Sequence, residues 1–188
     1  MKKLAVIFPG MGYTKDKPLL YYAGKLLANQ DHEIMYVEFT NLPKKIQGNL
    51  ELILKAADIS YEQAVGQLKD VNFSSYEEIV FVGKSIGTIV ASRYNAEHAL
   101  QAQQIWYTPL QATFEQDNVL DPKKVVAFIG TADPWSDVPE VQRTAENLGI
   151  ELHVYDDCNH SLECKDVDRN IVIMREVMEI TKQKILQK

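Results

Sequence analysis

The sequence has few of the features that cross-link a chain or anchor it in a membrane. Only two cysteines occur among its 188 residues, Cys158 and Cys164, and two are too few for a disulfide framework. No apolar run reaches the roughly 18 residues that a transmembrane helix needs. The apolar run at residues 4–8 ends at Pro9 and Gly10, too early for a signal peptide. These absences predict a cytoplasmic protein.

The chain also lacks an excess of positive charge. It carries 20 Lys and Arg against 26 Asp and Glu, a formal net charge of -6. Nucleic acids and anionic membranes bind clustered Lys and Arg, so we expect neither as a partner. There is no repeat, no low-complexity stretch and no linker long enough to separate two domains. We therefore predict a single domain spanning residues 1–188 that acts on a small molecule.

Short apolar segments alternate along the chain with longer segments of helical spacing. The predicted strands are residues 4–8, 34–39, 78–82, 104–107, 125–129 and 150–155. The predicted helices are residues 21–30, 50–68 with an interruption at 58–60, 86–100, 138–148, and a last helix with one apolar stripe at Val167, Ile171, Met174 and Met178. Such alternation is typical of βαβ units. The predicted fold class is therefore α/β, with three α/β/α layers and a six-stranded, mainly parallel sheet.

The pattern Gly-x-Ser-x-Gly occupies residues 83–87, between a predicted strand and a predicted helix. A strand that turns abruptly into a helix leaves Ser85 on a tight corner that points out of the sheet. Side chains two residues before and after the serine would collide there, which accounts for Gly83 and Gly87. Serine also caps helices, but a cap needs neither glycine. The pattern therefore predicts that Ser85 is a nucleophile.

Two further polar residues follow predicted strands. Asp133 comes after the fifth strand and His160 after the sixth. The carboxyl ends of parallel strands meet at one edge of a sheet, so both side chains are expected on the same side as Ser85. Serine needs a neighbouring base, which His160 would supply, and an acid would orient that base. We predict Asp133 as the acid because it lies nearer its strand end, with Asp137 as the alternative.

Three motifs carry a resemblance to a known family: Gly83-x-Ser85-x-Gly87, Gly130-x-x-Asp133 and Asn159-His160-Ser161. With these motifs and its order of elements, the sequence resembles the α/β-hydrolase superfamily in a minimal form. The resemblance implies a Ser-His-Asp triad and an oxyanion hole made by the backbone N–H groups of Ile86 and Met11. The loop around Met11 departs from the family's His-Gly-x-Gly pattern, because Pro9 stands in place of the histidine.

The segment at residues 108–122 is too short for the lid domain that larger hydrolases insert. An open site is therefore expected, which favours small or accessible esters or thioesters over sequestered lipids. The predicted protein is a carboxylesterase-like or thioesterase-like serine hydrolase that works through an acyl-enzyme, with no cofactor and no metal. The residues predicted to contact substrate are Gly10, Gly12, Tyr13 and Trp135.

Other interpretations compete with this one. Gly83-Lys84-Ser85 matches the end of a phosphate-binding loop, but that loop needs a glycine where the chain has Glu78. Cys158, His160 and Cys164 offer zinc-binding groups, but their spacing fits no standard zinc pattern.

A dinucleotide site is a further alternative, because Gly10-x-Gly12 follows the first strand and Glu38 ends the second. The position of the third glycine is Lys15, however, and the helix is expected to start later. The remaining alternative is an α/β-hydrolase fold that is catalytically silent and serves for binding, since a fold alone does not fix a function.

Overall fold

A computed structural model describes residues 2–115 and 119–187. Six strands form one sheet in the order β2-β1-β3-β4-β5-β6, and every neighbouring pair is parallel. The strands are β1 (Lys3–Phe8), β2 (His32–Tyr36), β3 (Glu78–Lys84), β4 (Gln103–Tyr107), β5 (Val125–Gly130) and β6 (Glu151–Tyr155). The α-helices of the described residues are α1 (Pro18–Ala28), α2 (Leu50–Leu68), α3 (Ile86–Glu97), α4 (Val138–Leu148) and α5 (Val167–Leu186). The described residues also form the short 3₁₀ turns η1 (Phe73–Ser75), η2 (Gln111–Phe114) and η4 (Pro122–Lys124).

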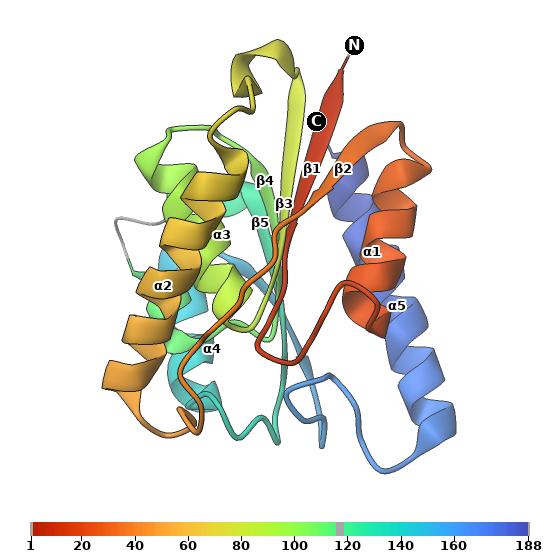
Figure 1. Cartoon of the computed structure of the whole chain (residues 1–188). Coiled ribbons are helices and arrows are strands. Elements are labelled where there is room, and N and C mark those ends of the chain that lie inside the picture. The colour runs from red at the N-terminus through yellow and green to blue at the C-terminus, as the bar shows by residue number, and fades with distance from the viewer. Residues whose placement is uncertain (1, 116–118, 188) are drawn as a thin grey trace.

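Helices cover both faces of the sheet, so the predicted three layers are confirmed. Helices α2, α3 and α4 lie on one face, and α1 and α5 lie on the other (Figure 1). Strand β3 shows why its sequence is a continuous apolar run. Val80 and Val82 belong to the core cluster that includes residues of α1 and α5, while Phe81 packs among residues of α2 and α3. A strand buried on both faces needs apolar residues at every position.

The order of the strands places the candidate site. The chain winds outward from β1 to β2 and then returns to β3 on the other side of β1. Ligands bind at the carboxyl ends of the strands where the winding reverses, because the loops diverge there and leave a crevice. Phe8 and Gly83 are register partners at those ends. The loop after β1 therefore lies beside Ser85, which follows β3.

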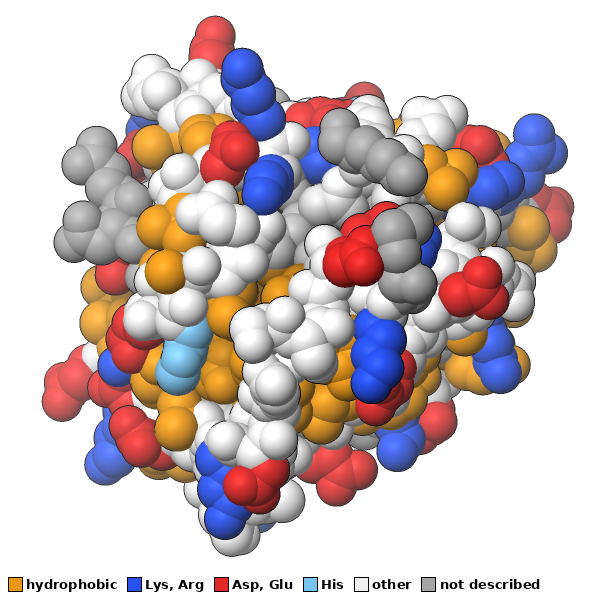
Figure 2. All heavy atoms as spheres, turned by 90° about the horizontal axis from the view of Figure 1, so that it is seen from above, with side chains coloured by type: hydrophobic (Ala, Val, Ile, Leu, Met, Phe, Trp, Pro, Cys, Tyr) orange, Lys and Arg blue, Asp and Glu red, His pale blue; other side chains and the backbone are white. Residues whose placement is uncertain are grey.

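The opposite edge of the sheet, where the strands begin, has a mixed charge. Acidic and basic side chains are interspersed on it (Figure 2). Lys3 and Glu78, at the starts of β1 and β3, form an ion pair of 3.0 Å there. Among the described residues, no helix is both long enough and apolar enough to cross a bilayer.

Several elements differ in extent from the predicted ones. Helix α1 begins at Pro18 rather than at residue 21, because proline is favoured in the first turn, where its missing N–H is not needed. Strand β2 is His32–Tyr36 rather than residues 34–39. The predicted interruption of α2 at residues 58–60 was wrong. Asp58 turns outward to pair with Arg93 at 2.9 Å, and the small Ser60 side chain is buried, so the helix continues.

The apolar stripe predicted for the last helix does not face the core along its whole length. Val167 and Ile171 are 70% and 65% exposed, although Met174 and Met178 pack against the core. The buried side of α5 is made instead by residues such as Ile173 and Val177. Val167 and Ile171 instead line a surface cavity that Pro18 and Tyr22 also border.

Candidate active site

Ser85 stands at a sharp junction between β3 and α3. Its backbone has φ 55° and ψ -123°, a conformation that residues other than glycine rarely adopt and that costs roughly 1–3 kcal/mol. A Cβ on Gly83 would lie 2.7 Å from Thr88 Cα, and one on Gly87 would lie 2.3 Å from the Phe8 carbonyl oxygen. Neither distance is tolerable, so both positions need glycine for the reason inferred from the sequence.

Backbone hydrogen bonds fix the loop after β5 against the loop after β6. The Ala132 N–H donates to the Cys158 carbonyl at 3.0 Å, and the Asp157 N–H donates to Thr131 Oγ1 at 2.8 Å. Asn159 then braces the turn that carries His160, because its side-chain oxygen accepts from the Ser161 N–H at 2.7 Å. The two loops are thus tied to each other at the rim of the sheet.

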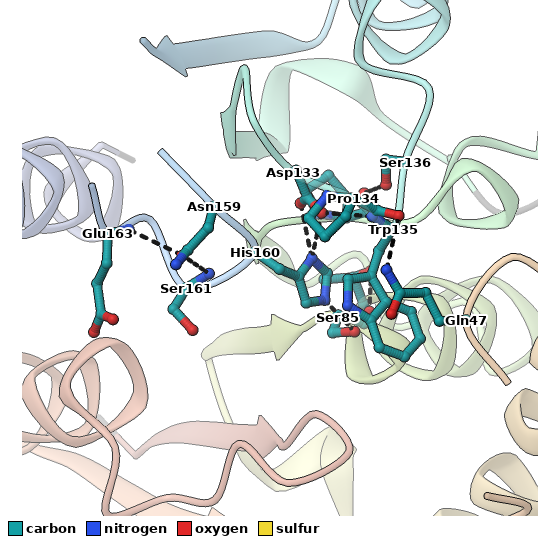
Figure 3. A network of polar contacts seen from close by, with 12 residues as sticks. Gln47, Ser85, Asp133, Pro134, Trp135, Ser136, Asn159, His160, Ser161 and Glu163 are labelled. Carbon is teal, nitrogen blue, oxygen red and sulfur yellow. Dashed lines mark hydrogen bonds and ion pairs between the residues drawn. The ribbon is translucent and has the colours of Figure 1, made fainter. Parts of the chain in front are cut away.

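His160 bridges the other two residues predicted for the triad. Its Nε2 lies 2.7 Å from Ser85 Oγ, and its Nδ1 lies 2.7 and 2.9 Å from the two carboxylate oxygens of Asp133 (Figure 3). The Asp133 carboxylate also accepts from the Trp135 N–H at 2.9 Å, which holds it in place. Asp137, the alternative acid, instead caps α4 by accepting from the Glu140 N–H. The structure therefore brings Asp133, and not Asp137, to the imidazole.

The surroundings of His160 favour its neutral form. Burial lowers the pKa of His160 below its ordinary value, and the hydrogen bond to Asp133 only partly offsets this effect. The indole of Trp135 stacks on the imidazole, with ring centroids 5.3 Å apart and planes 24° apart. A neutral imidazole beside a serine hydroxyl can accept its proton, which is the requirement for a general base.

The two residues predicted to form an oxyanion hole lie beside Ser85. Met11, in the loop after β1, and Ile86, the first residue of α3, line one cavity together with Ser85. Within the described residues, neither backbone N–H donates a hydrogen bond to a protein acceptor. These are the two donors that the sequence predicts for an oxyanion hole.

This cavity has a volume of about 220 Å³, below the roughly 300–1,000 Å³ of typical small-molecule sites. Of the residues predicted to contact substrate, Gly12, Tyr13 and Trp135 line it. Gly10 lines a neighbouring cavity of about 420 Å³, which shares Met11 and Gly12 with the first. The hydroxyl of Tyr13 is already engaged, because it accepts from the Leu19 N–H at 3.1 Å.

Sequence reasoning missed several residues of the cavity wall. Ile46 and Leu110 contribute apolar walls, and Lys84 and Ser161 also line the space. Ile46 belongs to the long segment after β2, whose path nothing in the sequence indicates. Lys84 stands inside the motif itself, but a sequence does not show that a lysine will be buried.

The competing metal interpretation finds no support in this geometry. Among residues 2–115 and 119–187, no group of three His, Cys, Asp or Glu side chains is arranged to hold an ion. Cys158 is buried beneath the site and its carbonyl is engaged with Ala132. His160 is engaged through both ring nitrogens.

Comparison with known proteins assigns the chain to a family. The sequence profile of a family described as an alpha/beta hydrolase domain matches residues 2–183. The chain belongs to the α/β-hydrolases. This match confirms the resemblance drawn from the motifs. It favours an α/β-hydrolase over the alternative of a dinucleotide-binding protein. A search of curated proteins found no match to this α/β-hydrolase.

Solved structures share the fold of this α/β-hydrolase. A lid-less α/β serine hydrolase from Xanthomonas campestris matches it with a TM-score of 0.69, at 16% identity, over 98% of this chain and 83% of that one. A serine hydrolase homologue from Coxiella burnetii gives 0.66, at 15% identity, over 97% and 84%. A Butyrivibrio proteoclasticus protein with bound ferulic acid gives 0.64, at 11% identity, over 98% and 90%. At these identities the likeness shows the fold alone.

Proposed function

We propose that this α/β-hydrolase is a serine hydrolase that cleaves a small ester or thioester. The observation that carries the proposal is the hydrogen-bonded line from Ser85 through His160 to Asp133, with 2.7 Å at each end. A buried acid, a neutral imidazole and a hydroxyl on a strained turn are the parts that nucleophilic acyl transfer needs. A module that only binds a ligand needs no such alignment.

The chemistry follows from these contacts. Ser85 Oγ would attack the carbonyl carbon while its proton passes to His160 Nε2, and the carbonyl oxygen would become an oxyanion held by the N–H groups of Met11 and Ile86. The proton would then go to the departing alcohol or thiol, leaving an acyl group on Ser85. Water would release this acyl group as a carboxylic acid, with His160 again taking and returning the proton. Asp133 would stabilise the imidazolium at each stage.

The size of the cavity supports a small acyl group. About 220 Å³ next to Ser85 is smaller than the roughly 300–1,000 Å³ of typical ligand sites, which favours a short acyl chain. The stretch between β4 and β5 is also short and contains η2 and η4 rather than a lid domain. A larger alcohol would extend toward the neighbouring cavity at the loop after β1.

The test is a series of 4-nitrophenyl esters of rising acyl length. We expect hydrolysis that is fastest for acetate to butyrate, falls for octanoate, and is lost in Ser85→Ala. Ser136→Ala is the matched control, because Ser136 lies near the site but donates to the Pro109 carbonyl rather than to His160. If Ser85→Ala hydrolyses these esters as fast as the wild type, the proposal is wrong.

A further inference from the structure

Two lysines are buried in the part of this α/β-hydrolase that the structure describes, and they differ in their partners. Lys184, in α5, is 5% exposed, donates to the Lys123 carbonyl at 2.7 Å and lies 3.6 Å from Glu151. Lys84, at the end of β3, is 1% exposed. None of the ion pairs or side-chain hydrogen bonds of the described residues involves Lys84 Nζ, which lies over the Tyr13 ring instead. A buried ammonium without a partner is unfavourable unless something else supplies one.

Aromatic and neutral groups surround Lys84. Its Nζ lies 4.9 Å from the centre of the Tyr13 ring, and its register partner on β4 is Tyr107. Asp133 is the nearest acid to influence it, but that carboxylate is already bound to His160 and to the Trp135 N–H. Burial lowers the pKa of Lys84 to about 7, and Asp133 offsets this only in part. The protein therefore leaves the charge of Lys84 poorly neutralised.

Lys84 also borders the cavity that holds Ser85 and His160. The other described residues around this space are mostly apolar, including Met11, Ile46 and Leu110, and none of them is acidic. Lys84 is the one lysine or arginine of that described wall. An anionic group placed in the cavity would meet a cation already desolvated, so pairing would require little further loss of water from the lysine.

We propose that Lys84 is a substrate-recognition residue whose ammonium pairs with a carboxylate carried by the substrate. The inference rests on the proposed hydrolase function and narrows its substrate class to small esters or thioesters that bear one carboxylate. That carboxylate can belong to the acyl group or to the alcohol or thiol group of the substrate. In both cases it would form the same ion pair with Lys84. The role differs from one in which Lys84 only tunes His160, because tuning would affect charged and neutral substrates alike.

The test compares matched pairs of substrates. Mono-4-nitrophenyl glutarate and 4-nitrophenyl valerate differ by an acyl-side carboxylate, and 4-acetoxybenzoate and its methyl ester differ on the alcohol side. For at least one pair, Lys84→Met should lower kcat/KM of the charged member at least about tenfold more than that of the neutral member. Lys184→Met, the control at the partnered lysine, should leave both ratios within about twofold. Equal losses for both members of both pairs overturn the proposal.

A second measurement needs no variant at position 84 and so holds even if Lys84→Met does not fold. The ratio of kcat/KM for the charged and neutral members is followed in the wild type from pH 7 to 9. Loss of the Lys84 proton should lower this ratio, because only the charged member depends on it. The other buried titratable groups near Lys84 have pKa values shifted away from this pH range. Burial raises the pKa of Tyr13 to about 12, raises the pKa values of Tyr107 and Cys158, and lowers the pKa of His160. A ratio that stays constant with pH overturns the proposal.

Equilibrium binding separates this inference from the hydrolase function. Calorimetric titration of Ser85→Ala with butyrate and with butyramide compares the affinities for a charged and a neutral ligand in the absence of turnover. Preference for butyrate that disappears when Lys84→Met is added supports the site even if no ester is cleaved. Ser85-dependent hydrolysis with no such preference and unchanged pair ratios supports the function and overturns the role of Lys84.

Discussion

Polar groups are paired with one another on the outer surface of α2 and α3, whereas some polar groups at the rim around Ser85 are left without a partner among the described residues. On the helix surface, Arg93 pairs with Asp58 at 2.9 Å and with Glu97 at 2.7 Å, and the Tyr61 hydroxyl also donates to Glu97. At the rim, Ser85 has a strained backbone, and Met11 and Ile86, whose backbone N–H groups form no hydrogen bond to the described loops, line a cavity beside it. Groups that stabilise the fold are satisfied within the protein, whereas groups left unsatisfied beside a cavity are available to a ligand.

The largest effect is expected from removing the imidazole. His160→Ala should lower kcat for short esters by about 10⁴-fold, because serine without a base is a weak nucleophile at neutral pH. The control is His153→Ala, since His153 pairs with Glu151 at 2.9 Å on β6, outside the site. Steady-state kinetics on both variants would contradict the account if they lost similar activity.

A single methyl group should distinguish the two regions by stability. Gly87→Ala would bring a Cβ within 2.3 Å of the Phe8 carbonyl oxygen and 2.5 Å of the Pro9 carbonyl oxygen, so α3 must move away from β1. We expect a loss of about 3 kcal/mol in the free energy of unfolding. Gly66→Ala, in α2, meets nothing within 4 Å and should stabilise the protein by about 0.5–1 kcal/mol. Urea denaturation measures both, and a loss of equal size in the two variants would refute the contrast.

The pH dependence of hydrolysis reports on the rim alone. Neutral His160 is the form that accepts the serine proton, so kcat/KM should be full above its pKa and fall about tenfold per pH unit below it. Because burial lowers the pKa of His160, the midpoint should lie below 6.5. A pH-stat assay of kcat/KM between pH 4.5 and 8 measures this midpoint. A value well above 6.5 would mean that the imidazole is not buried as described.

The smallest effect is expected on the helix surface. Glu97→Gln removes the charge that pairs with Arg93, but the two side chains are 48% and 32% exposed. Solvent screens such a pair, so the free energy of unfolding should fall by less than about 1 kcal/mol. Ester hydrolysis should not change. Thermal denaturation and a kinetic assay check the two statements, and a loss of activity in this variant would mean that the two regions are coupled.

Local patterns in the sequence were enough to predict the elbow and the sheet. Gly83 and Gly87 flank Ser85 for a steric reason that acts over a few residues, and the central strands β1, β3 and β5 are short apolar runs. The choice between the two acids could also have been sharpened from the sequence. Asp137 stands two residues before Pro139 and three residues before Glu140, which is the pattern of a helix cap.

Features set by distant contacts were not predictable. The break expected in α2 disappeared because Asp58 finds Arg93 from another helix. The apolar stripe of α5 indicated a core face, but Val167 and Ile171 in its first turns are exposed. Burial of Lys84 depends on Tyr13, which the loop after β1 folds over it. The periodicity of apolar residues describes one helix or strand at a time, so it does not predict contacts between residues of different elements.

The most direct test of the central claim is labelling of the wild-type protein with a fluorophosphonate, read by intact mass and peptide sequencing. The account predicts one adduct, located on Ser85, that is lost in Ser85→Ala and forms far more slowly in His160→Ala. A protein that is folded by circular dichroism yet acquires no adduct, or acquires one on another residue, would contradict it.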